Sequence, residues 1–263
     1  MIFIDQMFRD VELIGRPKRI ISLVPSQTEL LADLGLDEEV IGITKFCIYP
    51  EKWYRSKSRV GGTKQLNIEL IRSLNPDLII GNKEENTAED ISSLESIAPV
   101  WMSDISTLED ALKMIISIGE ITFKTIESKL LVKSILAKFN EFKKPIIERK
   151  VLYFIWKEPE FLAGKNTFID AMLDAAGFQN YCYLDRYPAL KDVEYSNPDF
   201  IFLSSEPYPF KEEHKAFFQK RFPEVKIVLV DGEMFSWYGS RMLLAPDYFQ
   251  RLGHELAIDH KGD

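Results

Sequence analysis

The stretch that decides the fold is Asn75-Pro76-Asp77-Leu78-Ile79-Ile80, which recurs later in the chain as Asn197-Pro198-Asp199-Phe200-Ile201-Phe202. In both copies a polar turn containing proline precedes a short apolar run that is typical of a buried strand. Proline also ends any helix that comes before it. A motif repeated so far apart indicates that a whole structural unit is duplicated.

Other elements surround the two copies in the same order. The apolar runs at 19–24 and 150–155 each predict a buried strand. A helix is expected after each of them, ending at Gly35 in the first copy and at Gly177 in the second. The remaining strands are expected at 40–43, 100–102, 181–183 and 226–230.

The predicted helices have recognisable starts. Ser26 and Glu29 have the spacing of a capping box, which predicts that Ser26 begins the first helix. Thr167 is expected to begin the matching helix of the second copy, and Asn67 another helix in the first. The run at 61–64, Gly-Gly-Thr-Lys, lacks the pattern of a phosphate-binding loop and is interpreted as a turn.

Strands that alternate with helices predict an α/β fold of two Rossmann-like lobes, each with a parallel sheet. A helical stretch over 107–144, broken near 123–125, lies between the copies. A helix of about 20 residues spans about 30 Å, enough to connect two lobes, although it would also fit the surface of one lobe. We expect an N-terminal lobe at 1–122, a connecting backbone helix at 123–145 and a C-terminal lobe at 146–263.

Composition excludes several classes of protein. The 263 residues include 33 Lys and Arg against 41 Asp and Glu, a formal charge of −8, which argues against sequence-independent binding of nucleic acid. Only 3 His and 2 Cys are present, too few for a disulfide framework or a zinc ribbon. The first ten residues have no basic region and do not resemble a secretory signal peptide. Either the protein is cytosolic or a leader is missing from this sequence.

Common catalytic and metal-binding motifs, including G-x-G-x-x-G, H-E-x-x-H, C-x-x-C and G-x-S-x-G, do not occur. His214, His254 and His260 all follow the second repeat's first strand, whereas a metal site between two lobes needs ligands from both. We expect none of the three to bind a metal or act as a base. Cys47 and Cys182 lie near the end of the second strand of each copy; semi-buried thiols are favoured over a pair facing each other across a cleft.

Ligands of open α/β sheets bind beyond the carboxyl ends of the strands. Aromatic and cationic residues are interleaved in the segments expected there, where rigid rings suit a large, flat ligand and cations suit its anionic groups. Taken singly, each ring is also explained by core packing and each lysine by a solvated loop. Their joint placement favours ligand binding. The candidate ligand-binding residues are Tyr49, Lys83, Trp156, Tyr187, Tyr208, Trp237, Tyr238 and Arg241.

The segments 19–30, 67–71 and 75–80 resemble signatures of the helical-backbone (class III) substrate-binding proteins of ABC importers, and the resemblance extends over essentially the whole chain. It is closest to the cobalamin-binding subgroup, whose relatives bind ferric siderophores and haem. The resemblance implies two lobes joined by one long helix, with a cobalamin-like corrinoid or another large metal chelate in the cleft between them. It further implies no enzymatic activity, no intrinsic cofactor, and a periplasmic or membrane-anchored extracytoplasmic location.

The resemblance also implies docking on an ABC permease through one surface carboxylate per lobe. The matching residue of the first lobe is Glu69, although an acidic residue in a first helical turn is favoured by the helix dipole alone. In the second lobe Lys191 occupies the expected position, so that Asp192 or Glu194 would substitute. We expect a monomer with a small-molecule chelate and a permease as partners, and no nucleic acid.

Two alternatives stay open. An intracellular enzyme or chelate-handling protein on the same two-lobed fold would explain the missing leader, but the sequence offers no nucleophile–base pair and no phosphate loop. A binding protein that has lost its transporter would keep the ligand site and would no longer need Glu69 and Glu194.

Overall fold

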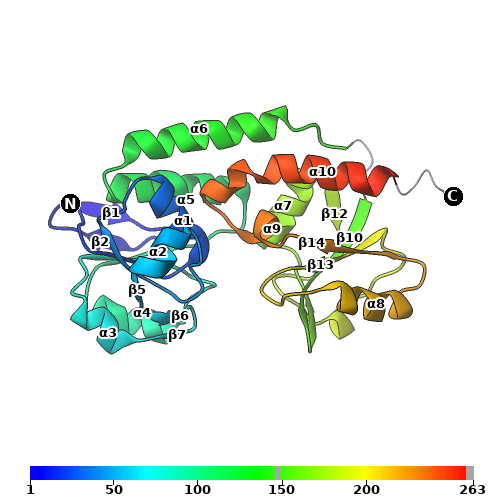
Figure 1. The fold of residues 1–263 in the computed structure, drawn as a ribbon, viewed down its shortest axis with the longest axis horizontal. Coiled ribbons are helices and arrows are strands. Elements are labelled where there is room, and N and C mark those ends of the chain that lie inside the picture. The colour runs from blue at the N-terminus through cyan, green and yellow to red at the C-terminus, as the bar shows by residue number, and fades with distance from the viewer. Residues whose placement is uncertain (146–148, 259–263) are drawn as a thin grey trace. The chain divides into compact units, whose positions relative to one another are not determined.

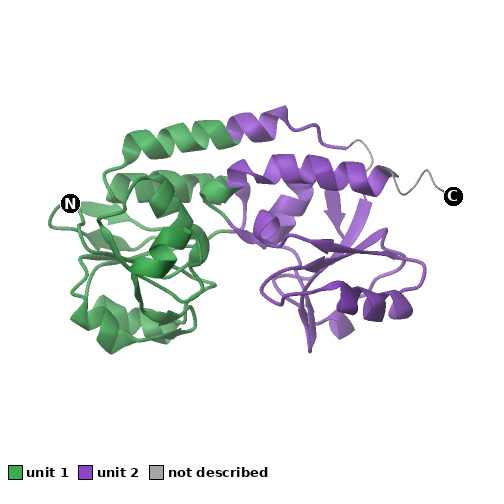
Figure 2. Cartoon of the chain, viewed as in Figure 1, with its two compact units in different colours: residues 1–105, 109–135, 238–241 green, residues 106–108, 136–237, 242–263 purple. Residues whose placement is uncertain are grey.

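A computed structural model describes residues 1–145 and 149–258 of the chain. The chain forms two compact units, coloured separately in Figure 2. Unit 1 contains residues 1–105, 109–135 and 238–241, and unit 2 contains 106–108, 136–237 and the residues from Met242 onward. Unit membership therefore does not follow sequence order, because a short segment near the C-terminus belongs to unit 1. The lobe boundaries expected from the sequence stay a prediction.

Unit 1 is built on a sheet of five parallel strands (Figure 1). Their order across the sheet is β5 (Ser58–Arg59), β4 (Val40–Ile43), β3 (Ile20–Ser22), β8 (Leu78–Asn82) and β9 (Val100–Ser103). The helices are α1 (Pro25–Asp33), α2 (Glu51–Ser56), α3 (Ile68–Ser73), α4 (Ala88–Glu95) and α5 (Leu108–Ile121). Every residue of β3, β8 and β9 is buried, as expected for a parallel sheet covered on both faces.

Two small hairpins complete unit 1: β1 (Ile2–Ile4) with β2 (Asp10–Glu12), and β6 (Gly61–Gly62) with β7 (Gln65–Leu66). The second hairpin is the turn predicted from the two glycines. We call residues 1–13, which contain the first hairpin, the N-terminal arm. It lies along the outer edge of β9, where the Gln6 N–H donates to the Met102 carbonyl over 3.1 Å.

Unit 2 has a mixed sheet. Its strands are β11 (Glu160–Leu162), β10 (Arg149–Lys157), β13 (Phe200–Ser204) and β14 (Lys226–Val230) in that order, with β12 (Phe178–Asn180) also pairing with β10. All pairs are parallel except β10 with β11. The helices are α7 (Phe168–Ala176), α8 (Glu212–Arg221), α9 (Glu233–Ser236) and α10 (Ala245–Ile258), with short 3-10 turns η1 (Leu190–Asp192) and η2 (Ser240–Leu243), the latter starting in unit 1.

The two units share one strand order. In unit 1 the second, first, third and fourth strands of the repeat are β4, β3, β8 and β9, and in unit 2 they are β12, β10, β13 and β14. In each unit the first strand lies between the second and the third. This is the doubly wound arrangement, in which the second strand is added on one side of the first strand and the later strands on its other side. The predicted α/β fold with two Rossmann-like halves is therefore confirmed.

The repeated motif turns the chain identically in both units. Asn75 has φ 47° and Asn197 has φ 49°, a left-handed conformation that asparagine tolerates better than most residues. The following proline then holds the chain away from helix. The turn thus ends one element and directs the next residues into β8 or β13.

The aspartate of the motif clamps the third strand to the first. The Asp77 carboxylate accepts the main-chain N–H groups of Lys18 and Arg19, both over 2.8 Å, and the Asp77 N–H donates to the Arg19 carbonyl. In unit 2 the Asp199 carboxylate accepts the Lys150 N–H over 2.7 Å, and the Asp199 N–H donates to the Lys150 carbonyl. The same carboxylate therefore sets the register of the two central strands in each unit.

The predicted helix starts are confirmed at two positions and wrong at one. Thr167 and Asn67 each accept a main-chain N–H from the first turn of their helix. Ser26, in contrast, lies inside α1, which begins at Pro25 without a side-chain cap. Proline is favoured at a first helical position because the N–H that it lacks would have no partner there.

The strand expected at 181–183 is also wrong, because β12 lies three residues earlier. The Tyr181 N–H makes the last bond to β10, donating to the Val151 carbonyl over 2.8 Å. The Asn180 side chain then accepts the Cys182 N–H over 3.1 Å and turns the chain away from the sheet. A local side-chain bond therefore ends a strand that residue preference alone would extend.

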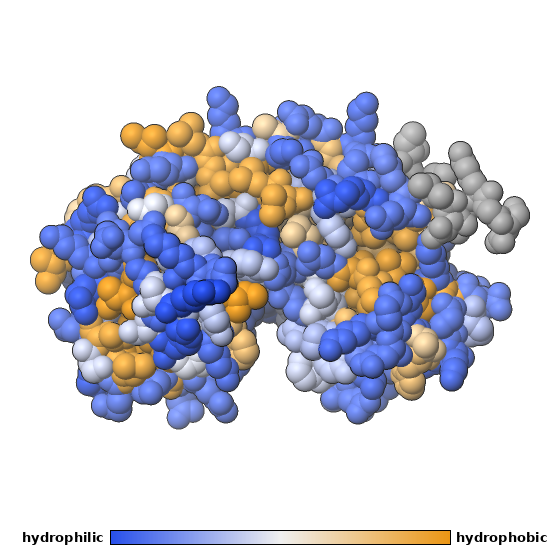
Figure 3. All heavy atoms as spheres, viewed as in Figure 1, coloured by the Kyte–Doolittle hydropathy of each residue, from blue (hydrophilic) through white to orange (hydrophobic). Residues whose placement is uncertain are grey.

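The helical stretch between the repeats breaks where the sequence predicts. Phe123 has φ 61°, and α6 (Thr125–Glu141) begins two residues later. The helix starts in unit 1 and ends in unit 2. Only Ser128 and Ile135 of its side chains are buried, whereas Ile126 and Leu130 are exposed, and apolar side chains are visible along α6 in Figure 3.

The clamp can be tested by removing its carboxylate. Asp77→Ala and Asp199→Ala are each expected to lower the free energy of unfolding by about 1–2 kcal/mol, because main-chain N–H groups lose their acceptor. Urea denaturation followed by circular dichroism measures the change. Glu224→Ala, at an exposed position in neither motif, should stay within about 0.5 kcal/mol. An effect of the motif variants no larger than that of this control would contradict the clamp.

Candidate ligand-binding site

Arg241 and Tyr49, both predicted from the sequence, lie together in unit 1. The Arg241 guanidinium is 4.3 Å from the centre of the Tyr49 ring, a cation–π contact. Its Nε donates to Glu29 Oε2 over 2.8 Å, and Nη2 donates to Oε1 over 2.5 Å. The arginine and glutamate side chains are 10% and 18% exposed. The guanidinium is therefore neutralised by a two-point ion pair, while 38% of Tyr49 is exposed.

Gly239 allows the segment 238–241 to approach α1. Its φ is +115°, a conformation that favours glycine. A Cβ at this position would lie 3.2 Å from the Ser26 carbonyl oxygen and 3.4 Å from the Leu30 Cβ. The close backbone contact brings Arg241 within reach of Glu29, although the two residues are 212 positions apart in the sequence.

Lys83, the second cation among the predicted residues, is also paired with a carboxylate. It follows β8, and its Nζ lies 2.6 Å from Oδ2 of Asp104, which follows β9. The two side chains are 53% and 34% exposed, so this pair is weaker than the one at Arg241. Neither counter-ion, Glu29 or Asp104, was predicted, because sequence reasoning has no signal for partners that only the fold brings together.

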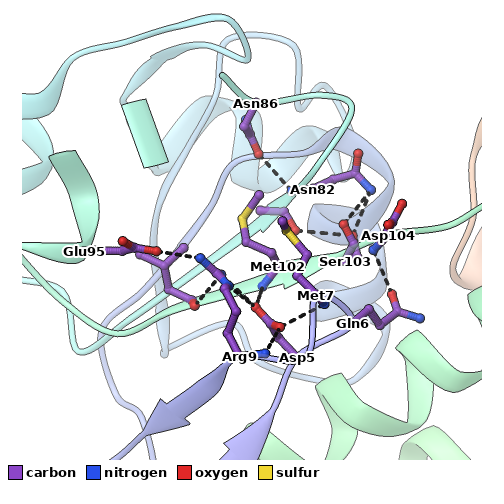
Figure 4. A network of polar contacts seen from close by, with 12 residues as sticks. Asp5, Gln6, Met7, Arg9, Asn82, Asn86, Glu95, Met102, Ser103 and Asp104 are labelled. Carbon is purple, nitrogen blue, oxygen red and sulfur yellow. Dashed lines mark hydrogen bonds and ion pairs between the residues drawn. The ribbon is translucent and has the colours of Figure 1, made fainter. Parts of the chain in front are cut away.

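A buried amide network supports the strand ends of unit 1. Asn82 Nδ2 and Gln27 Nε2 both donate to the Ser103 hydroxyl, over 2.9 and 2.6 Å, and the Asn82 N–H donates to Asn86 Oδ1. Figure 4 shows Asn82, Asn86 and Ser103 in these contacts. Such a network connects the ends of β8 and β9 to helix α1 and fixes the loop that carries Lys83.

Two predicted aromatic residues form a pair in unit 2. The Trp156 ring, at the end of β10, lies edge-on to the Tyr208 ring, which follows β13, with 5.6 Å between their centres. Trp156 is 40% exposed. Behind this pair, Tyr208 packs against Phe210 and His214, and its hydroxyl lies 3.1 Å from His214 Nε2. Because His214 Nδ1 accepts the Lys211 N–H, the neutral ring donates from Nε2 to Tyr208.

The remaining predicted residues differ in how much surface they offer. Tyr187 is 36% exposed and has the Arg186 guanidinium over its ring. Trp237 and Tyr238 are only 8% and 7% exposed, so most of each ring packs inside the protein. Among the predicted residues, the aromatic surface open to a ligand therefore belongs to Tyr49, Tyr187 and the Trp156–Tyr208 pair.

The two predicted docking carboxylates are accessible. Glu69 lies in the first turn of α3 with 85% of its side chain exposed, and its contact with Arg72 is long at 3.9 Å. Glu194 is exposed and follows η1, which carries Lys191. Their role in docking stays a prediction.

Thiols and imidazoles are the side chains that most often bind transition metals, so their positions matter for a metal site. Cys47 and Cys182 are free and buried, each inside its own unit, and burial raises the pKa of both thiols. Within residues 1–145 and 149–258, no three His, Cys, Asp or Glu side chains are grouped to hold a metal ion. His254 lies on α10 beside Gln250, and His260 lies outside the described residues. The helices described there are also too short or too polar to cross a membrane.

Comparison with known proteins identifies the family. Residues 20–226 match the family described as periplasmic binding protein, and the chain belongs to it. This confirms the resemblance to the substrate-binding proteins of ABC importers. The chain is 30% identical over 187 residues to an uncharacterised ABC transporter substrate-binding lipoprotein of Bacillus subtilis, covering 67% of this chain and 59% of the relative. It is 29% identical over 171 residues to a vitamin B12-binding protein of Vibrio campbellii, covering 63% and 60%.

The alignments thus span about 60% of the length of these two relatives. Among solved structures, the periplasmic heme-binding protein RhuT from Roseiflexus sp. RS-1 superposes with a TM-score of 0.77 at 20% identity, covering 91% of this chain and 99% of that one. At this identity the match shows that the fold is shared. The ligand has to be argued from the side chains of this chain.

One partly buried acid, Glu85, predicts a pH effect near the candidate site. Burial raises the pKa of Glu85 above its usual 4.5, and Lys64 only partly opposes this. The folded protein therefore holds the Glu85 proton more tightly than the unfolded chain does. The free energy of unfolding consequently falls as the pH rises above 4.5. Glu85→Gln is expected to raise Tm at pH 7.5 and to lose this advantage near pH 4, measured by scanning fluorimetry. Exposed Glu38→Gln should change little at either pH, and an equal gain at both pH values would contradict the assignment.

Proposed function

We propose that this protein is the substrate-binding component of an ABC importer, acting outside the cytoplasmic membrane. Membership of the periplasmic binding protein family supports this role, and so does the substrate-binding lipoprotein among its relatives. The same match favours a binding protein over an enzyme. Glu69 and Glu194, both exposed, are the proposed contacts with the permease.

The proposed ligand is a cobalamin-like corrinoid. The observation that carries this choice is the contrast between open aromatic rings and neutralised cations. Trp156 and Tyr49 are 40% and 38% exposed, whereas the predicted cations Arg241 and Lys83 are both ion-paired within the protein. Considered in each unit by itself, the exposed rings favour a ligand with a large apolar surface, and the paired cations of unit 1 contribute little to binding a carboxylate.

Charge separates the candidate chelates. Haem carries two carboxylates and many ferric siderophores are anionic, whereas the corrin periphery carries mainly neutral amides. An anionic group beside Arg241 would also meet the carboxylate of Glu29, and two like charges 4 Å apart repel by about 1 kcal/mol in water and about 4 kcal/mol near a protein surface. Breaking the mostly buried Arg241–Glu29 ion pair would cost more. The corrinoid avoids both penalties.

Aromatic contact supplies the expected affinity. Burying the exposed faces of Trp156 and Tyr208 against a flat ligand removes apolar surface from water, at about 25 cal/mol per Å². The edge-on Trp156–Tyr208 arrangement and the bond from His214 hold the two rings in place before the ligand arrives. A preformed surface loses less entropy on binding. The corrin ring also holds its own cobalt, which travels as part of the cargo.

The ligand class is tested by titrating the protein with cyanocobalamin, cobinamide, haemin and ferric citrate by calorimetry. Saturable binding of the two corrinoids is expected. Trp156→Ala should weaken it about tenfold, or about 1.4 kcal/mol, through lost ring contact. Phe217→Ala removes a ring that is 50% exposed on α8 and should leave affinity unchanged. Absence of saturable binding to either corrinoid would contradict the proposed ligand.

The charge argument has its own test. Glu29→Gln removes the counter-ion of Arg241 and is expected to raise haemin affinity relative to cyanocobalamin about tenfold, with a new dependence on salt. Glu51→Gln breaks the exposed pair with Arg55 in the same unit and serves as the matched control. An unchanged ratio of the two affinities in Glu29→Gln would show that Arg241 does not set ligand charge.

A further inference from the structure

Unit 1 contains a groove of about 410 Å³ whose lining includes none of the candidate ligand-binding residues. One wall is β2, residues 10–12, and the other is the segment 95–100, which joins α4 to the start of β9. Arg9 lies among the lining residues. We call this the β2–β9 groove. The first wall is a strand edge, whereas the second is the end of α4 and a turn that reaches β9 only at Val100. The direction of the main-chain groups of β2 and of Val100 follows from the strand pairing.

The β2 wall presents main-chain groups that β1 does not use. In the hairpin, the Leu13 N–H donates to the Met1 carbonyl, and the Asp5 N–H donates to the Arg9 carbonyl. Antiparallel pairs alternate between residues that bond to the partner strand and residues that face away. In the observed register, the N–H and C=O groups of Asp10 and Glu12 therefore point away from β1.

The β9 wall is the open edge of the five-stranded sheet. The Pro99 carbonyl accepts the Ile79 N–H and so faces β8, which places the main-chain groups of Val100 and Met102 on the outer edge. There the N-terminal arm takes the place of a sixth strand, because the Met102 N–H donates to Asp5 Oδ2 over 3.2 Å (Figure 4).

The cover provided by the arm ends at the groove. Arg9 Nη2 donates to the Val100 carbonyl over 3.2 Å, and beyond this bond the arm and β9 are separated by the groove. Among the described residues, no recorded contact satisfies the Val100 N–H. Main-chain groups without a partner at the edge of a sheet can form hydrogen bonds with an added strand.

The charged side chains around the groove are mainly acidic and favour a positively charged ligand. Asp10 and Glu12 are exposed at its rim, and Glu95 is 50% exposed. The single base among the lining residues, Arg9, is held by ion pairs of 2.7 Å to Asp5 and 2.5 Å to Glu95. The floor is apolar, because the lining residues Val11, Ala98 and Val100 are buried.

We infer that the β2–β9 groove binds an extended basic peptide segment of a partner protein by strand addition. An extended backbone offers the alternating donors and acceptors that the outward groups of Asp10 and Glu12 require, and its other edge can accept the Val100 N–H. Alternation of side chains would then direct apolar residues to the floor and lysines or arginines to the acidic rim. The three residues of β2 match about 10 Å of added strand.

The test uses labelled peptides and fluorescence anisotropy. The acetylated peptide Lys-Val-Lys-Val-Lys is expected to bind saturably, and its counterpart Glu-Val-Glu-Val-Glu should bind at least tenfold more weakly. A form of the basic peptide with N-methylated valines keeps its charge but loses main-chain donors, and should also bind at least tenfold more weakly. Equal affinity of the methylated form would overturn strand addition, and no binding of the basic peptide would overturn the proposal.

Variants locate the site and separate it from the corrinoid site. Asp10→Lys combined with Glu12→Lys should abolish peptide binding while leaving cyanocobalamin titrations unchanged. The matched control, Asp33→Lys with Glu38→Lys, reverses two exposed acids elsewhere on unit 1 and should keep peptide binding. Retained binding in the first double variant would overturn the assignment. Sedimentation that shows a dimer lost in that variant would instead identify a second copy of the chain as the occupant.

Discussion

The carboxylate of the repeated aspartate is the constraint on which each unit depends. Asp77 and Asp199 bind the main chain at the start of the first strand and thereby set its register against the third. The first strand is the one beside which the sheet changes direction, so its carboxyl end is where a ligand-binding crevice forms. Tyr49 and Lys83 follow strands on either side of β3, and Trp156 ends β10 itself. Within each unit, this bond between two strands thus helps to determine which loops lie next to one another.

The sequence predicted those parts of the fold that local chemistry controls. The repeated Asn-Pro-Asp motif, the Thr167 cap and the break at Phe123 all depend on nearby residues, and the structure has each of them. The two wrong predictions share a different cause. At Ser26 the proline before it displaced the helix start, and after β12 the Asn180 side chain ended the strand. In each case one neighbouring residue changed the structure that the sequence pattern predicted. Scales of residue preference for helix or strand do not include such an effect.

The site was predictable only as a list of side chains. Their positions at strand ends followed from the topology, and the structure brings Tyr49 to Arg241 and Trp156 to Tyr208. What the sequence could not supply was the electrostatic state of the cations. Glu29 neutralises Arg241 only because Gly239 lets the chain return against α1, a long-range contact without any local signature. The same cation therefore contributes differently to ligand binding when its charge is already paired within the protein.

This electrostatic state determines how capture responds to its surroundings. Binding through free cations weakens as salt screens the attraction, with a Debye length of about 8 Å at physiological ionic strength. Binding through aromatic burial depends on apolar area and is little affected by dissolved salt at these levels. In a protein of charge −8, the ion pairs of Arg241 and Lys83 leave these two cations with little long-range attraction for anions. If the proposed ligand binds at the candidate residues, ring contact after encounter then contributes more to its selection than charge does.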